Sequence, residues 1–197
     1  MNSPALPQSK KAEKGRKAIF IDRDGTLIVD KDYLHKPEEV EFFKGAVAAL
    51  KRGVDAGFEI VMVTNQSGVG RGYFTLEDVE KVHEHIAREL LTEQVSMLEV
   101  YVAPEAPDAP SRGRKPSPQF LFDARDEYGI DLKRSYMIGD KLIDLECGWN
   151  AGVRKSLLVR TGYGAKVEQK EKAMLRDAVV ADDISDAIDW ILKDSRG

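Results

Sequence analysis

The stretch Ala18-Ile19-Phe20-Ile21-Asp22-Arg23-Asp24-Gly25-Thr26 decides how the rest of the chain can fold. Its first four residues form an apolar run that favours β structure, which predicts a short buried strand. Two carboxylates follow one residue apart, and Gly25 then allows the chain to turn sharply. Because residues i and i+2 project to the same side at the end of a strand, Asp22 and Asp24 can point into one small volume.

Two carboxylates this close repel each other unless a cation lies between them, they share a proton, or they have separate roles. Mg²⁺ suits such a pair because it prefers hard oxygen ligands and often binds one or two carboxylates together with a substrate phosphate. An ionised carboxylate can also attack phosphorus directly, and a second one can carry the proton to the leaving group. An Asp-rich turn that only caps the next segment is the alternative. It accounts for two nearby aspartates but not for the whole string.

The string resembles the first motif of the haloacid dehalogenase (HAD) superfamily of phosphotransferases. The resemblance implies that Asp22 is the nucleophile and forms an aspartyl-phosphate. It implies that Asp24 protonates the leaving oxygen and then activates water. It also implies that Mg²⁺ is the cofactor, held by Asp22, the backbone carbonyl of Asp24, and Asp140. The interval 27–44, where a cap domain is inserted in some members, is too short for one here.

A second motif, Val63-Thr64-Asn65-Gln66-Ser67-Gly68-Val69-Gly70-Arg71-Gly72, follows the next predicted strand. Its alternating glycines can present backbone N–H groups to an anion, although a flexible linker would have the same composition. The position of Thr64 and Asn65 matches the second HAD motif, in which the hydroxyl binds the transferring phosphoryl group, and we expect Thr64 and Asn65 to hold the phosphoryl oxygens together with Lys115. The longer string resembles the branch that contains histidinol phosphatases and heptose-bisphosphate phosphatases.

A proline-rich loop over residues 104–118 carries the third candidate, Arg114-Lys115-Pro116. Long loops of this kind are often functional, and a phosphatase needs a fixed cation to stabilise charge on the phosphoryl oxygens. A solvated basic pair is the alternative. The third HAD motif is a lysine in this region, so the resemblance assigns that role to Lys115. Relatives often tie this loop with zinc through Cys and His. Residues 101–116 contain neither, so we expect no structural zinc, and the prolines can stiffen the loop instead.

The fourth motif is Gly139-Asp140-Lys141-Leu142-Ile143-Asp144, which matches the GDxxxD of the superfamily. Asp140 ends a predicted strand and is the expected metal ligand. Asp144 lies one helical turn later, and two roles stay open for it: support behind the site, or a favourable charge at a helix N-terminus. Arg71, Arg114 and Lys141 are the residues we expect to meet a second phosphate of the substrate.

Strands alternate with helices six times, which predicts a three-layer, Rossmann-like α/β fold with a parallel sheet. The expected strands are 18–21, 58–64, 98–103, 135–139, 156–160 and 178–181. In the HAD-like order 3-2-1-4-5-6, the motifs meet at one edge of the sheet, where such folds bind ligands. We expect Thr75 and Asp182 to cap the helices that follow them. Residues 161–164 are expected to belong to a surface excursion.

The whole chain has 197 residues and a formal net charge of −4, which suits one globular domain without a nucleic-acid footprint. We predict a flexible tail over residues 1–16 and a single domain over 17–195. No apolar run is long enough for a bilayer, and Cys147 is the only cysteine. A monomeric, cytoplasmic protein without a membrane partner is therefore expected. His83 and His85 are read as surface or boundary residues, and Cys147 and Trp149 as packing groups.

The resemblance implies removal of the 7-phosphate from D-glycero-D-manno-heptose 1,7-bisphosphate, a small phosphorylated sugar. Histidinol phosphate is the alternative substrate, although a cationic amine would favour acidic neighbours and the candidate residues are basic. A non-catalytic, phosphosugar-binding relative would be expected to have a broken motif, and none of the motifs is broken. A nucleic-acid 3′-phosphatase with a similar first motif fits less well with the acidic balance of the chain.

Overall fold

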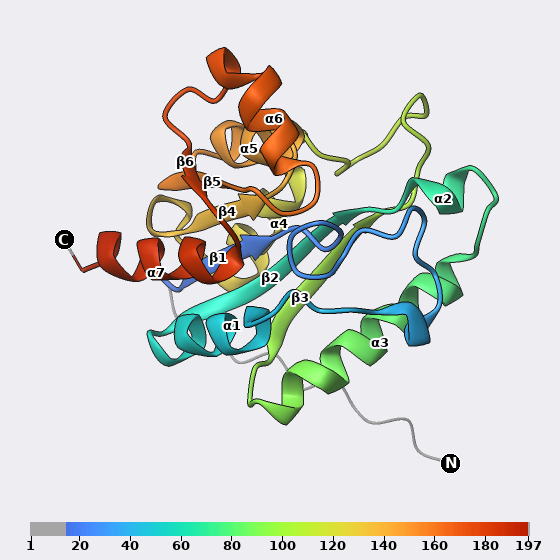
Figure 1. The fold of residues 1–197 in the computed structure, drawn as a ribbon, viewed down its shortest axis with the longest axis horizontal. Helices are drawn as coiled ribbons and strands as arrows, with labels where there is room; N and C mark the ends of the chain where they lie inside the picture. Colours follow the sequence, from blue (N-terminus) through green and yellow to red (C-terminus); the bar gives the residue numbers. More distant parts are fainter. Residues whose placement is uncertain (1–14, 197) are drawn as a thin grey trace.

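A computed structural model describes residues 15–196 of the protein. Six parallel strands form one sheet in the order β3-β2-β1-β4-β5-β6, as the sequence predicts (Figure 1). The strands are β1 (Lys17–Ile21), β2 (Phe58–Asn65), β3 (Met97–Ala103), β4 (Tyr136–Gly139), β5 (Lys155–Val159) and β6 (Val179–Ala181). Most of the predicted tail, residues 1–16, lies outside the described residues. Arg16 forms a bridge with Ile130 and so is bound to the folded part of the chain.

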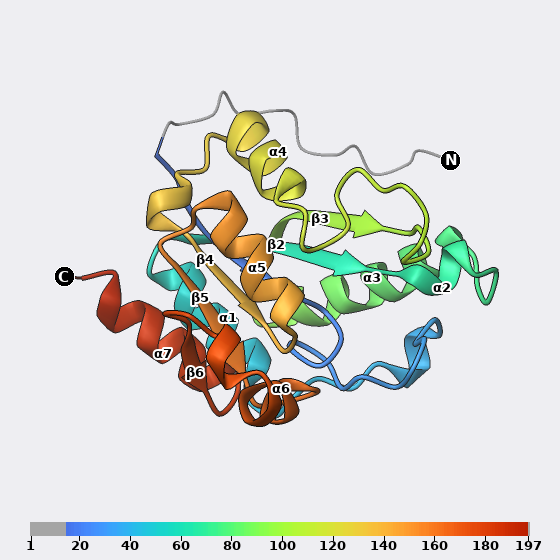
Figure 2. The same cartoon turned by 90° about the horizontal axis from the view of Figure 1, so that it is seen from above.

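Helices cover both faces of the sheet (Figure 2). On one face lie α1 (Ala46–Asp55), α3 (Leu76–Thr92) and α7 (Ile184–Asp194). On the other lie α4 (Gln119–Tyr128), α5 (Leu142–Ala151) and α6 (Gly164–Lys170). Alternation along β1 separates the two cores, because Ile19 and Ile21 pack on the first face and Ala18 and Phe20 on the second. The short elements are α2 (Ser67–Gly70), η1 (Pro37–Glu39), η2 (Leu132–Arg134) and η3 (Lys172–Met174).

The register of the sheet brings the motif residues to one level. Ile21 of β1 pairs with Met62 of β2 on one side and with Ile138 of β4 on the other. β1 and β4 therefore end side by side at the carboxyl edge of the sheet, and β2 continues for three more residues, to Asn65. This is the edge at which parallel α/β sheets bind their ligands.

The helix starts show where local sequence signals hold and where they do not. Thr75 caps α3 in a full capping box with Asp78, as predicted. The prediction that Asp182 caps α7 is wrong, because the Asp183 carboxylate accepts from the backbone N–H groups of Ser185 and Asp186. Asp182 directly follows β6 and forms an ion pair with Arg160 instead.

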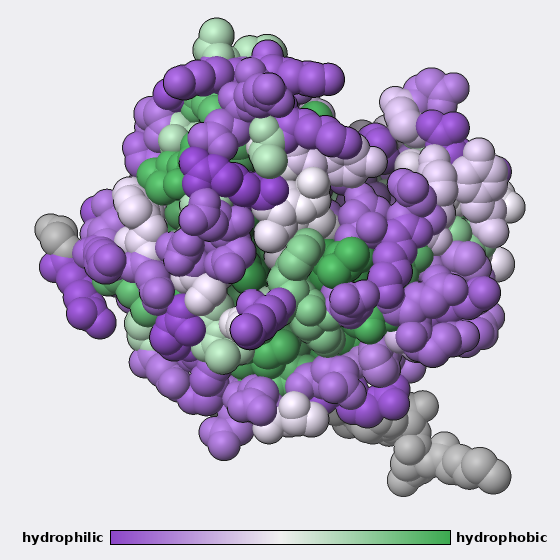
Figure 3. Space-filling model, in the orientation of Figure 1, coloured by the Kyte–Doolittle hydropathy of each residue, from purple (hydrophilic) through white to green (hydrophobic). Residues whose placement is uncertain are grey.

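The connection between β1 and α1, residues 22–45, contains only η1 and two isolated bridges among its described residues, so no cap domain is inserted there. The surface in the view of Figure 3 is mostly hydrophilic, with a hydrophobic strip near its middle. Within residues 15–196, no helix has the length and apolar character needed to cross a membrane.

Candidate active site

Three carboxylates from two strand ends and one helix start gather at the carboxyl edge of the sheet. One oxygen each from Asp22, Asp140 and Asp144 lies within 4.8 Å of the others, and all three side chains are buried. Asp22 follows β1, Asp140 follows β4, and Asp144 is in the first turn of α5. The sequence predicted the meeting of Asp22 and Asp140 and left the position of Asp144 open.

Lys115 places its ammonium group between two of these carboxylates. Its Nζ lies 2.5 Å from Asp22 Oδ1 and 2.7 Å from Asp144 Oδ1, and it donates to the Val63 carbonyl at 2.8 Å. Burial alone would lower the pKa of Lys115, but the two carboxylates outweigh burial and raise it above its usual value. The lysine is therefore a permanent cation at the floor of the site. We call Asp22, Lys115, Asp140 and Asp144 the aspartate–lysine cluster.

Asn65 holds the backbone from which Lys115 extends. Its side-chain Oδ1 accepts from the Lys115 N–H at 3.0 Å, and its Nδ2 donates to the Lys115 carbonyl at 3.2 Å. Both polar atoms of the amide are thus engaged by one residue of the loop. This arrangement fixes where the lysine enters the site.

The environment of Asp140 suits a cation ligand. Its Oδ2 accepts from the backbone N–H of Tyr163 at 2.8 Å, whereas its buried Oδ1 has no hydrogen-bond partner among residues 15–196. Burial first, and then the charges of Asp22 and Asp144, raise the pKa of Asp140 to about 8. Burial likewise raises the pKa of Asp22 to about 6, against the opposing effect of Lys115. An unpartnered oxygen among converging carboxylates fits Mg²⁺, which takes hard oxygen ligands.

The segment 161–164 forms one wall of the cluster, which corrects its interpretation as a surface excursion. Besides the Tyr163 N–H, Thr161 contributes a hydroxyl that donates to the Gly25 carbonyl at 2.7 Å. Gly25 and Gly162 both have positive φ, and a Cβ atom on either would overlap the Asp140 carboxylate. Glycine is required at both positions, because the two backbones close directly around Asp140.

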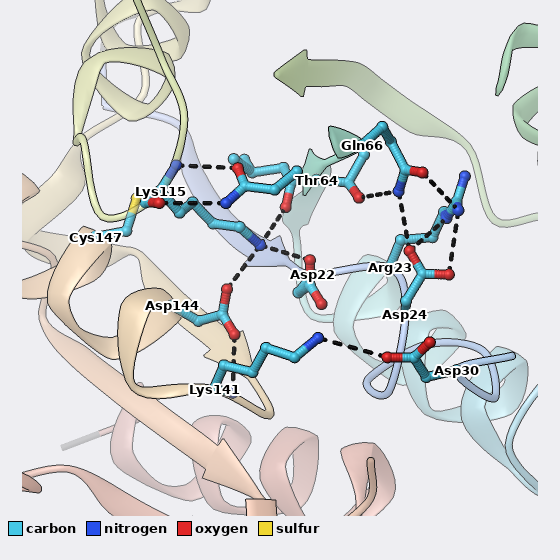
Figure 4. Close-up of polar contacts among 12 residues, drawn as sticks. Asp22, Arg23, Asp24, Asp30, Thr64, Gln66, Lys115, Lys141, Asp144 and Cys147 are labelled. Carbon is cyan, nitrogen blue, oxygen red and sulfur yellow. Dashed lines mark hydrogen bonds and ion pairs between the residues drawn. The ribbon is translucent and has the colours of Figure 1, made fainter. Parts of the chain in front are cut away.

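Asp24 lies on the other side of Asp22 and is held by an arginine (Figure 4). Arg23 Nε donates to Asp24 Oδ2 at 3.0 Å, and Arg23 Nη2 donates to Asp24 Oδ1 at 3.1 Å. Gln66 Nε2 donates to Asp24 Oδ2 at 2.9 Å and to the Thr64 hydroxyl at 2.8 Å. The sequence analysis missed Arg23 and Gln66, although both lie within the quoted motifs. We call Arg23 and Gln66, with Asp24 between them, the arginine clamp.

His83 of α3 supports the clamp from behind. Its Nε2 lies 3.1 Å from Arg23 Nη1, and because an arginine always donates, this nitrogen is the acceptor. Burial and the nearby Arg23 lower the pKa of His83 to about 3, so the ring stays neutral. The prediction of a boundary position agrees with its half-buried side chain, but its partner could not be read from the helix pattern.

The remaining predicted ligands line the approaches to the site. The Thr64 side chain is buried beside the clamp, and Lys141 Nζ lies 3.5 Å from Asp30 and 4.8 Å from the centroid of the Tyr163 ring. Arg114 donates to the Glu105 carbonyl at 3.2 Å. Arg71 follows Gly70, whose N–H donates to the Pro104 carbonyl, so Arg71 and Arg114 lie at the same end of the 104–116 loop. Burial first, and then the charge of Arg71, lower the pKa of Arg114, against the opposing effect of Glu105. Lys141 and the two arginines thus stand in separate places.

A pocket of about 180 Å³ opens beside Asp24. It is polar and has an acidic edge, since Asp30 and Asp32 line it together with Tyr33 and Lys141. Ser67 and Gly68 of α2 also line it, so the glycine-rich string folds into one helical turn at the pocket wall. A leaving group next to Asp24 would occupy this space.

The loop over 104–116 is ordered by its own polar contacts. The Ser111 hydroxyl donates to Glu105 Oε2 at 2.7 Å and accepts from the Arg114 N–H at 3.1 Å. The Gly70 N–H donates to the Pro104 carbonyl at 2.8 Å, which ties the loop to α2. These bonds, together with the prolines, hold Arg114 and Lys115 in place.

Comparison with known proteins agrees with this geometry. A family model described as polynucleotide kinase 3 phosphatase matches residues 17–148, and one described as HAD-hydrolase-like matches residues 113–187. The D-glycero-beta-D-manno-heptose-1,7-bisphosphate 7-phosphatase of Helicobacter pylori strain J99 is 41% identical over 73% of this chain and 83% of its own length. The chain belongs to the HAD-like phosphatases.

Two further relatives of this HAD-like phosphatase bear on its site. The D-glycero-alpha-D-manno-heptose-1,7-bisphosphate 7-phosphatase of Photorhabdus laumondii is 36% identical over 81% of this chain and 90% of its own length. A crystal structure of D,D-heptose 1,7-bisphosphate phosphatase from B. bronchiseptica, complexed with magnesium and phosphate, superposes with a TM-score of 0.84. It is 30% identical and covers 90% of this chain and 99% of its own. Relatives named for both anomers therefore lie at similar identity.

Proposed function

We propose that the protein is a Mg²⁺-dependent phosphatase that removes the 7-phosphate of D-glycero-D-manno-heptose 1,7-bisphosphate. The observation that carries the proposal is the aspartate–lysine cluster, in which oxygens of Asp22, Asp140 and Asp144 converge and the Lys115 ammonium pairs with Asp22 and Asp144. A relative of known structure was crystallised with magnesium and phosphate, and the relatives described above are named for this sugar.

In the proposed mechanism, Asp22 attacks phosphorus and forms an aspartyl-phosphate, while Asp24 gives a proton to the leaving oxygen. Asp24 then takes a proton from the water that releases phosphate from Asp22. Lys115 and the Thr64 hydroxyl stabilise charge on the phosphoryl oxygens, and Asn65 positions Lys115 through its backbone. Asp22, Asp140 and the Asp24 carbonyl would hold Mg²⁺, which neutralises phosphate charge when bound.

The second phosphate of the sugar requires cations away from Lys115. Arg71 and Arg114 lie at the same end of the 104–116 loop, because the Gly70 N–H donates to the Pro104 carbonyl and Arg114 donates to the Glu105 carbonyl. Lys141 lies at the edge of the pocket next to Asp24 and is paired with Asp30, whereas the Arg114 guanidinium has no ion pair within residues 15–196. We therefore favour the two arginines as the site of the second phosphate.

One observation favours histidinol phosphate as a second candidate. Asp30 and Asp32 line the pocket beside Asp24, and acidic side chains there would suit a leaving group that carries an amine. The arginines on the other side would then have no second phosphate to bind.

The deciding experiment compares kcat/KM for the two heptose 1,7-bisphosphate anomers and for histidinol phosphate, with Mg²⁺ and after EDTA. A preference of tenfold or more for a bisphosphate, abolished by EDTA, is expected. A preference for histidinol phosphate would overturn the substrate assignment. No phosphate release from any of the three would favour a non-catalytic phosphosugar-binding protein.

Other parts of the proposal concern the setting of the enzyme. We propose that it works as a monomer in the cytoplasm, with residues 17–195 as its single domain and without a nucleic-acid partner. Its negative net charge supports the last point, even though one matching family model is described by a polynucleotide phosphatase. Size-exclusion chromatography with light scattering tests the oligomeric state.

A further inference from the structure

A buried arginine next to the proposed acid/base residue carries this inference, which rests on the role proposed above for Asp24. Arg23 is only 1% exposed and is among the largest side chains that are fully buried in residues 15–196. Removing a guanidinium from water is costly unless its donors are satisfied. Its contacts therefore indicate what the buried charge is for.

The first set of contacts fixes the Asp24 carboxylate. Two nitrogens of the planar guanidinium, Nε and Nη2, donate to the two carboxylate oxygens at 3.0 and 3.1 Å. A bidentate pair of this kind sets the plane of the carboxylate as well as its position, which a single point charge cannot do. Gln66 adds a third donor, at 2.9 Å from Oδ2.

The second set of contacts fixes Arg23 itself. Its Nη2 also donates to Gln66 Oε1 at 3.0 Å and to the Leu34 carbonyl at 3.3 Å, and its Nη1 donates to His83 Nε2 at 3.1 Å. These partners come from the end of β2, the connection after β1, and α3. Three separate segments thus hold one guanidinium in a fixed orientation.

Arg23 and Gln66 hold the Asp24 carboxylate away from the aspartate–lysine cluster, at the wall of the pocket. Figure 4 shows the Asp24 carboxylate directed toward Arg23 and Gln66, on the side away from Lys115. Arg23, Asp24 and Gln66 all line the pocket that a leaving group would occupy. Proton transfer depends steeply on the distance and direction of the donating group, so orientation at this point matters for the reaction.

We propose that Arg23 is a positioning residue that orients the Asp24 carboxylate for proton transfer, and that Gln66 and His83 hold Arg23 in that role. In the first step, the Asp22–phosphorus bond forms, the bond from phosphorus to the leaving oxygen breaks, and the proton moves from Asp24 to that oxygen. In the second, Asp24 takes the proton of the attacking water as phosphate leaves Asp22. Arg23 exchanges no proton in either step.

The test uses two esters that differ in their need for a proton. A sugar alkoxide leaves poorly without one, whereas p-nitrophenolate leaves unaided. Because kcat/KM reports only the steps up to the aspartyl-phosphate, the later use of Asp24 does not enter. Arg23→Lys keeps the charge and removes the fork. We expect Arg23→Lys to lower kcat/KM for heptose bisphosphate about 100-fold, because proton transfer to the sugar oxygen is lost. For p-nitrophenyl phosphate, which needs no proton, we expect a fall of about fivefold or less.

Two further variants separate the possible outcomes. The quantity compared is kcat/KM for heptose bisphosphate divided by kcat/KM for p-nitrophenyl phosphate. Asp24→Asn should lower this ratio at least as much as Arg23→Lys. Ile86→Val, a matched change in the buried stripe of α3 near His83, should leave the ratio at its wild-type value. An equal fall for both esters in Arg23→Lys would overturn the positioning role. An unchanged ratio in Asp24→Asn would overturn the proposed role of Asp24, and this inference with it.

Variants of Gln66 and His83 test the same proposal if Arg23→Lys does not fold. Gln66→Met and His83→Ala leave Arg23 in place. His83→Ala removes one hydrogen bond to Arg23, whereas Gln66→Met removes the bond to Arg23 and the bonds to Asp24 and Thr64. Both should lower the ratio in the same direction as Arg23→Lys, by about three- to tenfold from one lost hydrogen bond for His83→Ala and by more for Gln66→Met. A wild-type ratio in both would overturn the proposal.

Discussion

The two sides of the active site are built differently. The aspartate–lysine cluster is made of charged residues at strand ends and loop ends, which the register of the sheet brings together. The arginine clamp consists of residues whose partners come from α3 and from the connection after β1. In the proposed function, the aspartate–lysine cluster binds the phosphoryl group, which is common to all phosphate esters. The arginine clamp lines the pocket proposed for the leaving group, so we expect changes there to alter selectivity.

The largest expected effect is on the phosphoryl side. Asp22→Asn keeps the shape of the side chain but removes the nucleophile, so turnover should fall by at least about 10³-fold. The loss should be similar for every phosphate ester, because all of them transfer the same group. Phosphate release measures it, with circular dichroism as the check on folding.

A matched control is Asp189→Asn, which changes an exposed aspartate of α7 that pairs with Arg52. It should keep wild-type turnover. Near-wild-type activity in Asp22→Asn would remove the basis of the proposed mechanism.

The second prediction concerns the buried ion pairs of the cluster. Asp144→Ala leaves Lys115 with one carboxylate instead of two and removes the acceptor of the Lys141 N–H. Breaking a buried pair costs about 3–5 kcal/mol, and the remaining Asp22 should keep the loss near the lower value. Urea unfolding without Mg²⁺ measures the free energy of unfolding.

Asp144→Asn gives the internal comparison, since its amide oxygen can still accept from the Lys141 N–H. It should lose less stability than Asp144→Ala. Equal stability of the alanine variant and the wild type would show that the pair with Lys115 contributes nothing.

The third prediction links the metal to pH. The pKa values of Asp140 and Asp22, about 8 and about 6, lie above the ordinary value of 3.8 in the metal-free protein. Protons then bind the folded state more tightly than the unfolded one. The stability from these groups is present at low pH and is lost as pH rises through about 6 and then about 8.

Mg²⁺ competes with the same protons, so its affinity should rise between pH 5 and pH 8, by up to about tenfold per pH unit for each proton released. Calorimetry in buffers of different ionisation enthalpy measures both the affinity and the protons. Asp140→Asn should weaken binding and flatten the slope. A Mg²⁺ affinity independent of pH in the wild type would contradict the raised pKa values.

The smallest expected effect is in the 104–116 loop, which carries Arg114. Ser111→Ala removes the hydroxyl that joins Glu105 to the Arg114 N–H, which is worth about 1 kcal/mol. If Arg114 binds the second phosphate, KM for the bisphosphate should rise about fivefold, while kcat stays unchanged. Ser195→Ala, at the end of α7, is the control and should change neither. A lower kcat with an unchanged KM would place the loop in the chemical step instead.

The sequence predicted the cluster better than the clamp for a physical reason. In the HAD-like strand order, which right-handed crossovers allow, Asp22 and Asp140 end neighbouring strands and the Lys115 loop can fold over them, so their meeting could be predicted. The partners of Arg23 depend on how α3 packs, which no local pattern specifies. Asp144 could not be assigned because both alternatives are true: Oδ1 pairs with Lys115, and Oδ2 accepts from the Lys141 N–H.

Two further predictions from the sequence, for Asp182 and for residues 161–164, were wrong because contacts with distant residues decide both. Asp182 and Asp183 are equally good caps by composition, and only the pairing of Asp182 with Arg160 decides between them. The segment 161–164 has the composition of a surface turn, yet it closes on Asp140 from a distant part of the chain. An arginine placed directly after a buried strand, between two aspartates, was the one local signal that could have pointed to the clamp.

The contact between Gly25 and Gly162 constrains how this enzyme can diversify. A side chain on Gly25 or Gly162 would displace the Asp140 carboxylate, so almost no substitution is tolerated at these two positions. The pocket beside Asp24 is lined instead by full-sized side chains of the connection after β1, those of Asp30, Asp32, Tyr33 and Leu34. New substrate preferences, whether by drift or by laboratory selection, should therefore accumulate in that connection while the two glycines stay fixed.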